Sequence, residues 1–121
     1  MARIINIPSF ADERGILSTL EGALPFSVRR IFFIHSVPQG AKRGGHRHHE
    51  TTLLLLCVSG SCEVLVKREG NERRFRLDRP DTGLLLDPEE WRLMENFSEG
   101  AVLLAAASTA YDPSDYICEP A

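Results

Sequence analysis

The chain has 121 residues, 43% hydrophobic and 26% charged, which is the ordinary balance of a globular protein and fits one domain over residues 1–121. The net charge of −3 excludes a general nucleic-acid-binding protein, because such proteins rely on a basic surface. The longest apolar run, residues 53–58, is about a third of a membrane span, and no N-terminal signal peptide is visible, so we predict a cytoplasmic protein without membrane contact.

Short runs of β-forming residues, interrupted by Gly, Pro and Asp, follow one another along the whole chain. In order, the expected strands are residues 3–7, 15–21, 29–37, 52–58, 62–69, 72–77, 83–87 and 102–108. The turn Ser59-Gly60-Ser61 predicts a hairpin between the fourth and fifth of these strands, and Gly70-Asn71 predicts a second hairpin directly after it.

The last third of the chain is also read as β-structure. Residues 103–107 have helical propensity, but their short length and the strand-like run before them favour a strand. The tail from Tyr111 onward contains Asp and Pro residues that interrupt regular secondary structure, so it is expected to be irregular. Many short strands with frequent turns predict an all-β fold, either a sandwich or a barrel.

The chemistry-bearing residues are concentrated around His46 and His48. Gly40 lies six residues before His46, and Gly60 lies twelve residues after His48. This spacing matches the first cupin motif, G-x5-H-x-H-x4-E-x6-G, at every fixed position except the glutamate, where the chain has Leu53. Alternate residues of a strand share a face, so both imidazoles are expected to point the same way, in a small barrel toward the interior.

A metal site needs more donors than this stretch clearly supplies. Metal-binding cupins take two histidines and a glutamate from the first motif and another histidine from the second. Leu53 has no donor atom, and the segment that matches the second motif, residues 83–97, contains no histidine. Because Zn²⁺ and Fe²⁺ take at least three protein ligands, we predict no metal and no other cofactor. A metal-dependent cupin stays open as an alternative that elemental analysis decides.

Two imidazoles on one strand face also suit proton transfer without a metal. Histidine has an ordinary pKa of about 6.5, so it takes and returns protons at physiological pH. Such a pair fits a reaction that removes a proton from one carbon and delivers one to the neighbouring carbon. The alternative structural interpretation is an exposed polar turn whose histidines are incidental.

Beyond this motif, the chain resembles the nucleotide-sugar 3,4-ketoisomerases of the cupin superfamily, which act on dTDP-4-keto-6-deoxyglucose. The resemblance implies a single-domain jelly roll, a homodimer that exchanges N-terminal strands, and a metal-free enzyme of deoxysugar biosynthesis that moves the ketone from C4 to C3 through an enediol. It extends over nearly the whole chain and rests on DERG, LPFSVRRIFFI, RGGHRHH, SGSCEVLV, RPDTGLLL, PEEWRLMENFSEGAVLLAAAS and YDPSDYI.

The same resemblance implies roles for four residues. His48 matches the base that takes the C3 proton, and His46 matches the neighbour that shuttles or positions protons. Arg43 matches an arginine suited to the pyrophosphate, because a guanidinium pairs with phosphate in a bidentate way. Arg14 matches an arginine that meets the nucleotide.

We further predict that Phe33, Trp91 and Asn96 bind substrate, with Trp91 against the nucleotide base, although core packing is the simpler interpretation of that tryptophan. Tyr111 and Tyr116 are interpreted as structural contacts of the tail.

At several positions the chain departs from the family pattern. Family members often carry tyrosines at positions 32 and 33, where this chain has Phe32 and Phe33, a lysine in place of His49, a glutamine in place of Leu53 and a tyrosine in place of Leu85. The phenylalanines and leucines remove hydroxyl or amide groups that could polarise the sugar carbonyl, and losing one such donor lowers a rate on the order of 100-fold. The alternative function is therefore a non-catalytic or altered-specificity nucleotide-sugar-binding cupin.

Overall fold

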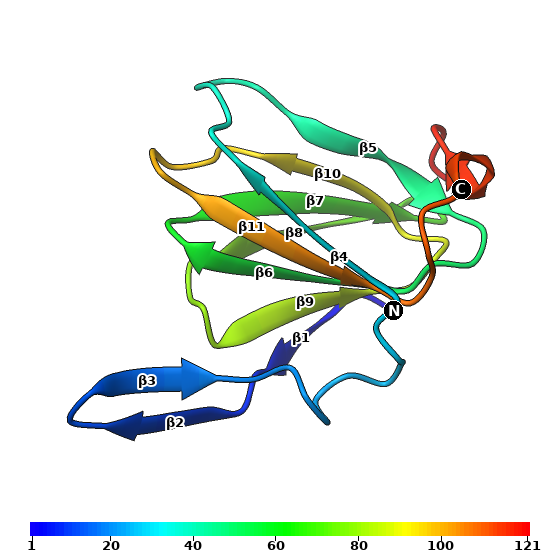
Figure 1. Ribbon diagram of the computed structural model, residues 1–121. Helices are drawn as coiled ribbons and strands as arrows, with labels where there is room; N and C mark the ends of the chain where they lie inside the picture. Colours follow the sequence, from blue (N-terminus) through cyan, green and yellow to red (C-terminus); the bar gives the residue numbers. More distant parts are fainter.

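The computed structural model describes residues 1–121 as twelve β-strands and one short 3-10 helix (Figure 1). No helix has the length and the apolar composition needed to cross a membrane. The elements are β1 (Arg3–Asn6), β2 (Ser9–Asp12), β3 (Gly15–Ser18), β4 (Arg30–His35), β5 (Arg43–His48), β6 (Leu53–Ser59), β7 (Cys62–Arg68), β8 (Asn71–Leu77), β9 (Thr82–Leu86), β10 (Trp91–Glu95), β11 (Val102–Ala107), η1 (Pro113–Asp115) and β12 (Tyr116–Ile117).

Two five-stranded antiparallel sheets form a sandwich. One has the order β1-β9-β6-β11-β4 and the other the order β12-β5-β10-β7-β8. The hairpin β2–β3 belongs to neither sheet and projects from the body beyond β1 (Figure 1). The predicted all-β cupin jelly-roll fold is confirmed, and the run at residues 103–107 is indeed a strand, β11.

The hydrophobic core explains the burial pattern of the central strands. Along β7, buried and half-buried residues alternate, so that Val64 and Val66 point between the sheets. In β6, by contrast, five successive residues are buried, because Leu54 and Leu56 on its outer face are covered by a second apolar cluster that includes Phe26. Each fully buried leucine contributes about 1.5–3 kcal/mol of hydrophobic stabilisation.

The predicted hairpin around Gly60 is wrong, whereas the one around Gly70 is confirmed. β6 pairs with β11 and β9, and β7 pairs with β10 and β8, so the turn at Gly60 carries the chain from one sheet to the other. A tight turn can join two paired strands of one sheet or two strands of different sheets, and the local sequence does not distinguish these two arrangements. β7 and β8 form a regular hairpin with Arg68 opposite Asn71.

β4 and β5 are the strands that leave one side of the sandwich open. β4 is the edge of its sheet, and β5 is covered by β12 at only two residues, where Tyr116 pairs with His48 and Ile117 with Arg47. The candidate site lies between these two strands.

Candidate active site

A cavity of about 460 Å³ opens where β4 and β5 face each other, a size in the range of small-molecule sites. Arg30 and His48 lie at the end next to the C-terminal tail, whereas Ile34 and Arg43 lie toward the other end. The other residues of the wall are Phe32, Gly44, His46, Leu53, Leu55, Arg92, Met94, Tyr111, Pro113 and Tyr116.

His46 and His48 enter the cavity from β5, as their alternation along the strand predicts. Their ring centroids are 5.2 Å apart and the rings are nearly perpendicular, at 86°. Gly44, two residues before His46, has a φ of +86°, and a Cβ there would meet Met94 Sδ at 3.0 Å and the Arg92 carbonyl oxygen at 3.1 Å. The absence of a side chain therefore lets β5 approach β10 at the irregular register that precedes the histidines.

Asp115 holds His48 in one orientation from the far end of the sequence. Its Oδ2 lies 2.9 Å from His48 Nδ1 and also accepts from the Thr51 hydroxyl, while its Oδ1 accepts from the Glu50 backbone N–H. Although burial acts to raise the pKa of Asp115, the hydrogen bonds from Thr51, Glu50 and His48 lower it overall. An ionised carboxylate only accepts, so the proton of neutral His48 sits on Nδ1 and Nε2 is left as a base.

Both imidazoles are neutral at physiological pH. Burial, with help from the Arg92 and His46 charges, lowers the pKa of His48 to about 4, against the opposing effect of Asp115. Burial and Arg92 also lower the pKa of His46. Only 3% of His48 is exposed, so desolvation of the charged ring outweighs the nearby carboxylate.

Arg92 is a fully buried cation whose guanidinium has no carboxylate in contact. Its Nε donates to the Glu90 carbonyl at 2.8 Å and its Nη2 to the Asp87 carbonyl at 3.2 Å, but Nη1 is buried without any partner. Burial lowers the pKa of Arg92 to about 10, opposed by Glu90, the Tyr116 phenol and Asp115. Arg92 lines the cavity, so a bound anion or carbonyl oxygen would supply the acceptor that Nη1 lacks.

Arg30 and Arg43 add two further guanidinium groups that lack carboxylate partners. Arg30 lies 5.4 Å from the Phe32 ring and 5.5 Å from the Tyr111 ring, and its Nε is buried without a hydrogen-bond partner. Arg43, an exposed residue at the start of β5, lines the cavity at the end away from the C-terminal tail. A chain with a net charge of −3 therefore has a cavity rich in unpaired positive charge, which suits an anionic ligand.

The C-terminal tail is more ordered and closer to the site than the sequence predicted. Instead of being irregular, it forms η1 and β12, whose pairing with β5 brings Asp115 and Tyr116 to the histidines. Tyr111 and Tyr116, interpreted as structural contacts, both line the cavity. The segment YDPSDYI contains the residues that form η1 and β12, but Asp and Pro are also typical of loops, so the sequence alone did not indicate this ordered structure.

Four predicted substrate-binding residues do not line this cavity in the chain itself. Arg14 lies on the turn of the β2–β3 hairpin and pairs with Asp12. Phe33 is 61% exposed on the outer face of β4, because strand alternation turns Phe32 inward instead. Trp91 and Asn96 also lie elsewhere: the Trp91 indole donates to the Cys118 carbonyl, and Asn96 donates to Glu63.

The departures from the family pattern fall into two groups. Phe32 and Leu53 line the cavity, so their missing polar groups affect its chemistry directly. Phe33, His49 and Leu85 do not line it. The structure also gathers no group of three or more His, Cys, Asp or Glu side chains that could hold a metal ion.

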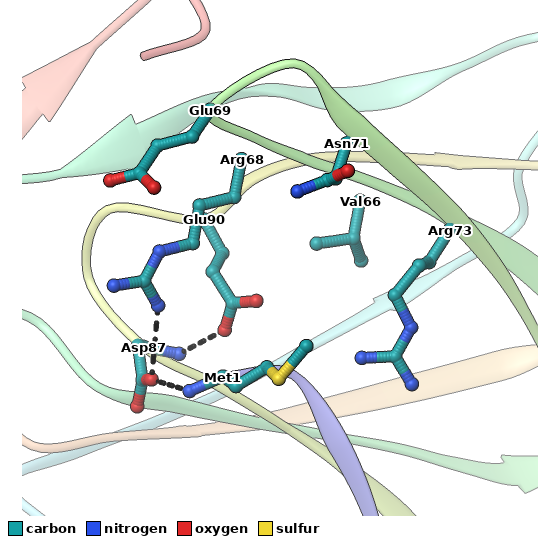
Figure 2. Close-up of a pocket in the computed structure, with 8 residues that line it drawn as sticks. All are labelled: Met1, Val66, Arg68, Glu69, Asn71, Arg73, Asp87 and Glu90. Carbon is teal, nitrogen blue, oxygen red and sulfur yellow. Dashed lines mark hydrogen bonds and ion pairs between the residues drawn. The ribbon is translucent and has the colours of Figure 1, made fainter.

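A second cavity, of about 410 Å³, lies at the start of β1 against the β7–β8 turn, and its charged groups are largely paired (Figure 2). Asp87 contacts both Arg68 and the Met1 amine, and Glu90 accepts from the backbone N–H of Ala2 and of Asp87. It contains no imidazole, and the contacts of Asp87 and Glu90 leave Glu69 as its one carboxylate without a partner, so it lacks the histidine pair of the first cavity. Its walls are Met1, Val66, Arg68, Glu69, Asn71, Arg73, Asp87 and Glu90.

Residues 1–121 match the model of a protein family described as FdtA: WxcM-like, C-terminal. The chain belongs to this family. The resemblance to sugar ketoisomerases in the sequence is thereby confirmed. A relative from Aneurinibacillus thermoaerophilus, a TDP-4-oxo-6-deoxy-alpha-D-glucose-3,4-oxoisomerase, is 34% identical over 117 residues, covering 95% of this chain and 84% of its own.

Solved structures agree with this membership of the FdtA family. QdtA, a sugar 3,4-ketoisomerase from Thermoanaerobacterium thermosaccharolyticum solved with TDP, has a TM-score of 0.94 and 34% identity, with 98% of this chain and 88% of its own covered. A variant of QdtA with one histidine replaced by asparagine was solved with TDP-4-keto-6-deoxyglucose. WlaRB, a TDP-quinovose 3,4-ketoisomerase from Campylobacter jejuni, has a TM-score of 0.93 and 36% identity, covering 98% and 92%.

Proposed function

We propose that the chain is a metal-independent 3,4-ketoisomerase that moves the ketone of a dTDP-linked 4-keto-6-deoxy hexose from C4 to C3 through an enediol. The observation that carries the proposal is the arrangement at His48. Asp115 fixes Nδ1 and leaves Nε2 as a neutral base, next to the unpaired guanidinium of Arg92. The names of the relatives point to the same reaction.

In this mechanism His48 takes the proton from C3 and returns it to C4. The low pKa of His48, about 4, keeps the base neutral before reaction and makes its conjugate acid a ready proton donor afterwards. His46, perpendicular to it, positions the proton-transfer path. Arg92 Nη1 stabilises the negative charge that develops on the sugar oxygen as the enediol forms, which a buried donor does better than an exposed one.

The diphosphate and the nucleotide need cations outside the reacting centre. Arg43 lies toward the end of the cavity away from His48 and, in this proposal, pairs with the diphosphate. Arg30 lies at the same end as His48 and faces the sugar. These assignments use the three guanidinium groups of the cavity wall, none of which has a carboxylate partner.

We also propose that the protein is a homodimer with exchanged N-terminal strands. All residues of the hairpin β2–β3 are exposed, including the apolar side chains of Phe10, Ile16 and Leu17. An isolated two-stranded hairpin is marginally stable in water, so a partner surface is expected to cover it. β4 offers such a surface, because it is an edge strand whose Ile31 and Phe33 are exposed.

In such a dimer, Arg14 meets the nucleotide bound by the partner. A mixture of Arg14→Ala and His48→Asn subunits tests this arrangement, because a mixed dimer has one site with both residues intact only if Arg14 acts across the interface. We expect activity to be regained on mixing after dissociation and reassociation. Activity that stays absent in verified mixed dimers would contradict the assignment.

The reaction itself is tested by NMR on the purified protein with dTDP-4-keto-6-deoxyglucose in deuterated buffer. We expect a 3-keto product and deuterium at the reacting carbons. Asp115→Asn is expected to lower kcat about 100- to 10,000-fold with little change in KM, because it removes the carboxylate that fixes the base. His48→Asn is expected to abolish the product while calorimetry still detects dTDP binding.

The alternative, a non-catalytic nucleotide-sugar-binding protein, is favoured by the apolar Phe32 and Leu53 in the cavity wall. It predicts dTDP binding without product, and unchanged binding by His48→Ala. If the protein does not bind dTDP at all, both functions are contradicted.

Elemental analysis of untagged protein tests metal independence: we expect less than about a tenth of an equivalent of metal, since a three-ligand site retains its ion.

A further inference from the structure

The dipeptide Asp115-Tyr116 reaches the histidine pair with both of its side chains. While Asp115 holds His48 Nδ1, the Tyr116 ring packs on both imidazoles, with centroid distances of 4.6 Å to His46 and 4.6 Å to His48. β12 fixes this placement, because Tyr116 is the register partner of His48. The tyrosine is therefore part of the same rigid unit as the base.

Hydroxyl groups are scarce in this cavity. Among the residues of its wall, only Tyr111 and Tyr116 carry one, and the wall beside them includes the apolar side chains of Phe32 and Leu53. Tyr111 is 67% exposed at the rim, whereas Tyr116 is half-buried beside the imidazoles. The Tyr116 hydroxyl makes no hydrogen bond to the protein and is close enough to Arg92 to act on it electrostatically. A phenol so placed has only a ligand or solvent as its partner.

We propose that Tyr116 is a further catalytic residue, which carries protons between the two sugar oxygens while His48 carries them between the two carbons. The inference rests on the proposed isomerase function and answers a need of that reaction. Moving a ketone from C4 to C3 requires O4 to gain a proton and O3 to lose one, in addition to the transfer between carbons. O3 and O4 sit on adjacent carbons, so one phenol oxygen can reach both.

The two steps balance without any other reactant. In the first, His48 takes the C3 proton, the C3–H electrons form the C3=C4 bond, and the former carbonyl electrons on O4 take the phenol proton. In the second, the Tyr116 phenolate takes the O3 proton, C3=O forms, and the C3=C4 electrons bond C4 to the proton held by His48. C3 is oxidised, C4 is reduced, and both side chains return to their starting states. Arg92 stabilises the phenolate between the steps.

Tyr116→Phe tests the assignment, because it keeps the ring that packs on the imidazoles and removes only the hydroxyl. Substrate labelled with deuterium at C3 is incubated in ordinary water, and two rates are followed: loss of the label from recovered substrate and formation of the 3-keto product. We expect product formation to fall on the order of 100-fold. Label loss should fall much less, since His48 and Arg92 still form the enediolate.

Tyr111→Phe, which removes the other hydroxyl of the cavity wall, is the comparison variant, and we expect it not to separate the two rates as Tyr116→Phe does. His46→Asn should lower both rates in parallel. A Tyr116→Phe variant that forms product within threefold of the wild-type rate would overturn the proposal. A proportional fall of both rates in Tyr116→Phe would also overturn it, because it indicates that the tyrosine only positions the histidines. The same holds if product formation falls much more than label loss in His46→Asn but not in Tyr116→Phe. A wild-type protein with neither label loss nor product would overturn the isomerase function itself.

Discussion

Arg92 illustrates how a single residue can serve function at the expense of folding. It is fully buried, donates to two backbone carbonyls, and keeps Nη1 without a partner beside His46 and His48. Removing a guanidinium from water without a carboxylate opposes folding. An unpaired donor of this kind is instead expected where a ligand oxygen binds.

Arg92→Met is therefore expected to separate stability from activity. Methionine fills similar volume without the charge, so the free energy of unfolding should stay within about 1 kcal/mol of wild type or exceed it, despite the two carbonyls that lose a donor. The kcat should fall on the order of 100-fold. Denaturant unfolding and steady-state kinetics measure the two effects, and a loss of stability of several kcal/mol would indicate a structural role instead.

The lowered pKa of His48 leads to a second prediction for a single residue, which concerns the pH dependence of stability. In the unfolded chain it is about 6.5, and in the folded protein burial lowers it to about 4. Between these values the unfolded chain binds the proton and the folded protein does not, so stability decreases as the pH falls from about 6.5 toward 4.

Between pH 7 and pH 5 the loss attributable to His48 should be up to about 2 kcal/mol. Denaturant unfolding of wild type and His48→Gln at both pH values isolates this contribution, because His46 remains in both proteins. Asp115, whose pKa is lowered, affects stability only below this window. Equal pH dependence in the two proteins would contradict the expectation.

At the level of elements, β5 is shaped by the glycine that precedes its histidines. Gly44 has a φ of +86° and lies against Met94 and the Arg92 carbonyl, whereas Gly70, in the β7–β8 turn, has a φ of +81° with open space around it. Both positions impose the same backbone strain on an alanine, of about 1 kcal/mol, but only Gly44 adds a steric clash.

Gly44→Ala is accordingly expected to destabilise the protein by about 1–3 kcal/mol more than Gly70→Ala, and to lower activity by displacing His46. Gly70→Ala should leave kcat unchanged. Thermal unfolding and the isomerase assay on both variants check this difference, and equal behaviour of the two would show that the close approach of β5 to β10 is not needed.

On the scale of the whole molecule, apolar surface is concentrated on the projecting hairpin and on the outer face of β4. Ile16 and Leu17 are 73% and 63% exposed, and Ile31 and Phe33 are 58% and 61% exposed. Such surfaces are usually covered in an assembly, which here is the proposed strand-exchanged dimer.

Ile16→Glu is expected to shift the protein from dimer to monomer, because it places a charge where the proposed interface is apolar. Glu99→Lys, a charge change on an exposed loop, should leave the dimer intact. Light scattering coupled to size-exclusion chromatography measures both. A wild-type protein that is monomeric at micromolar concentration would contradict the dimer.

The sequence by itself determined what depends on local periodicity: an all-β fold, the β7–β8 hairpin, and His46 and His48 on one face of a strand. Only the tertiary structure decided that β6 and β7 belong to different sheets, because a turn does not encode the partners of the strands it joins. It also decided the surroundings of the base, since His48 and Asp115 are 67 residues apart and meet only through the pairing of β12 with β5. The sequence also could not predict that Arg92 Nη1 lacks a hydrogen-bond partner, because this depends on the positions of all the surrounding groups.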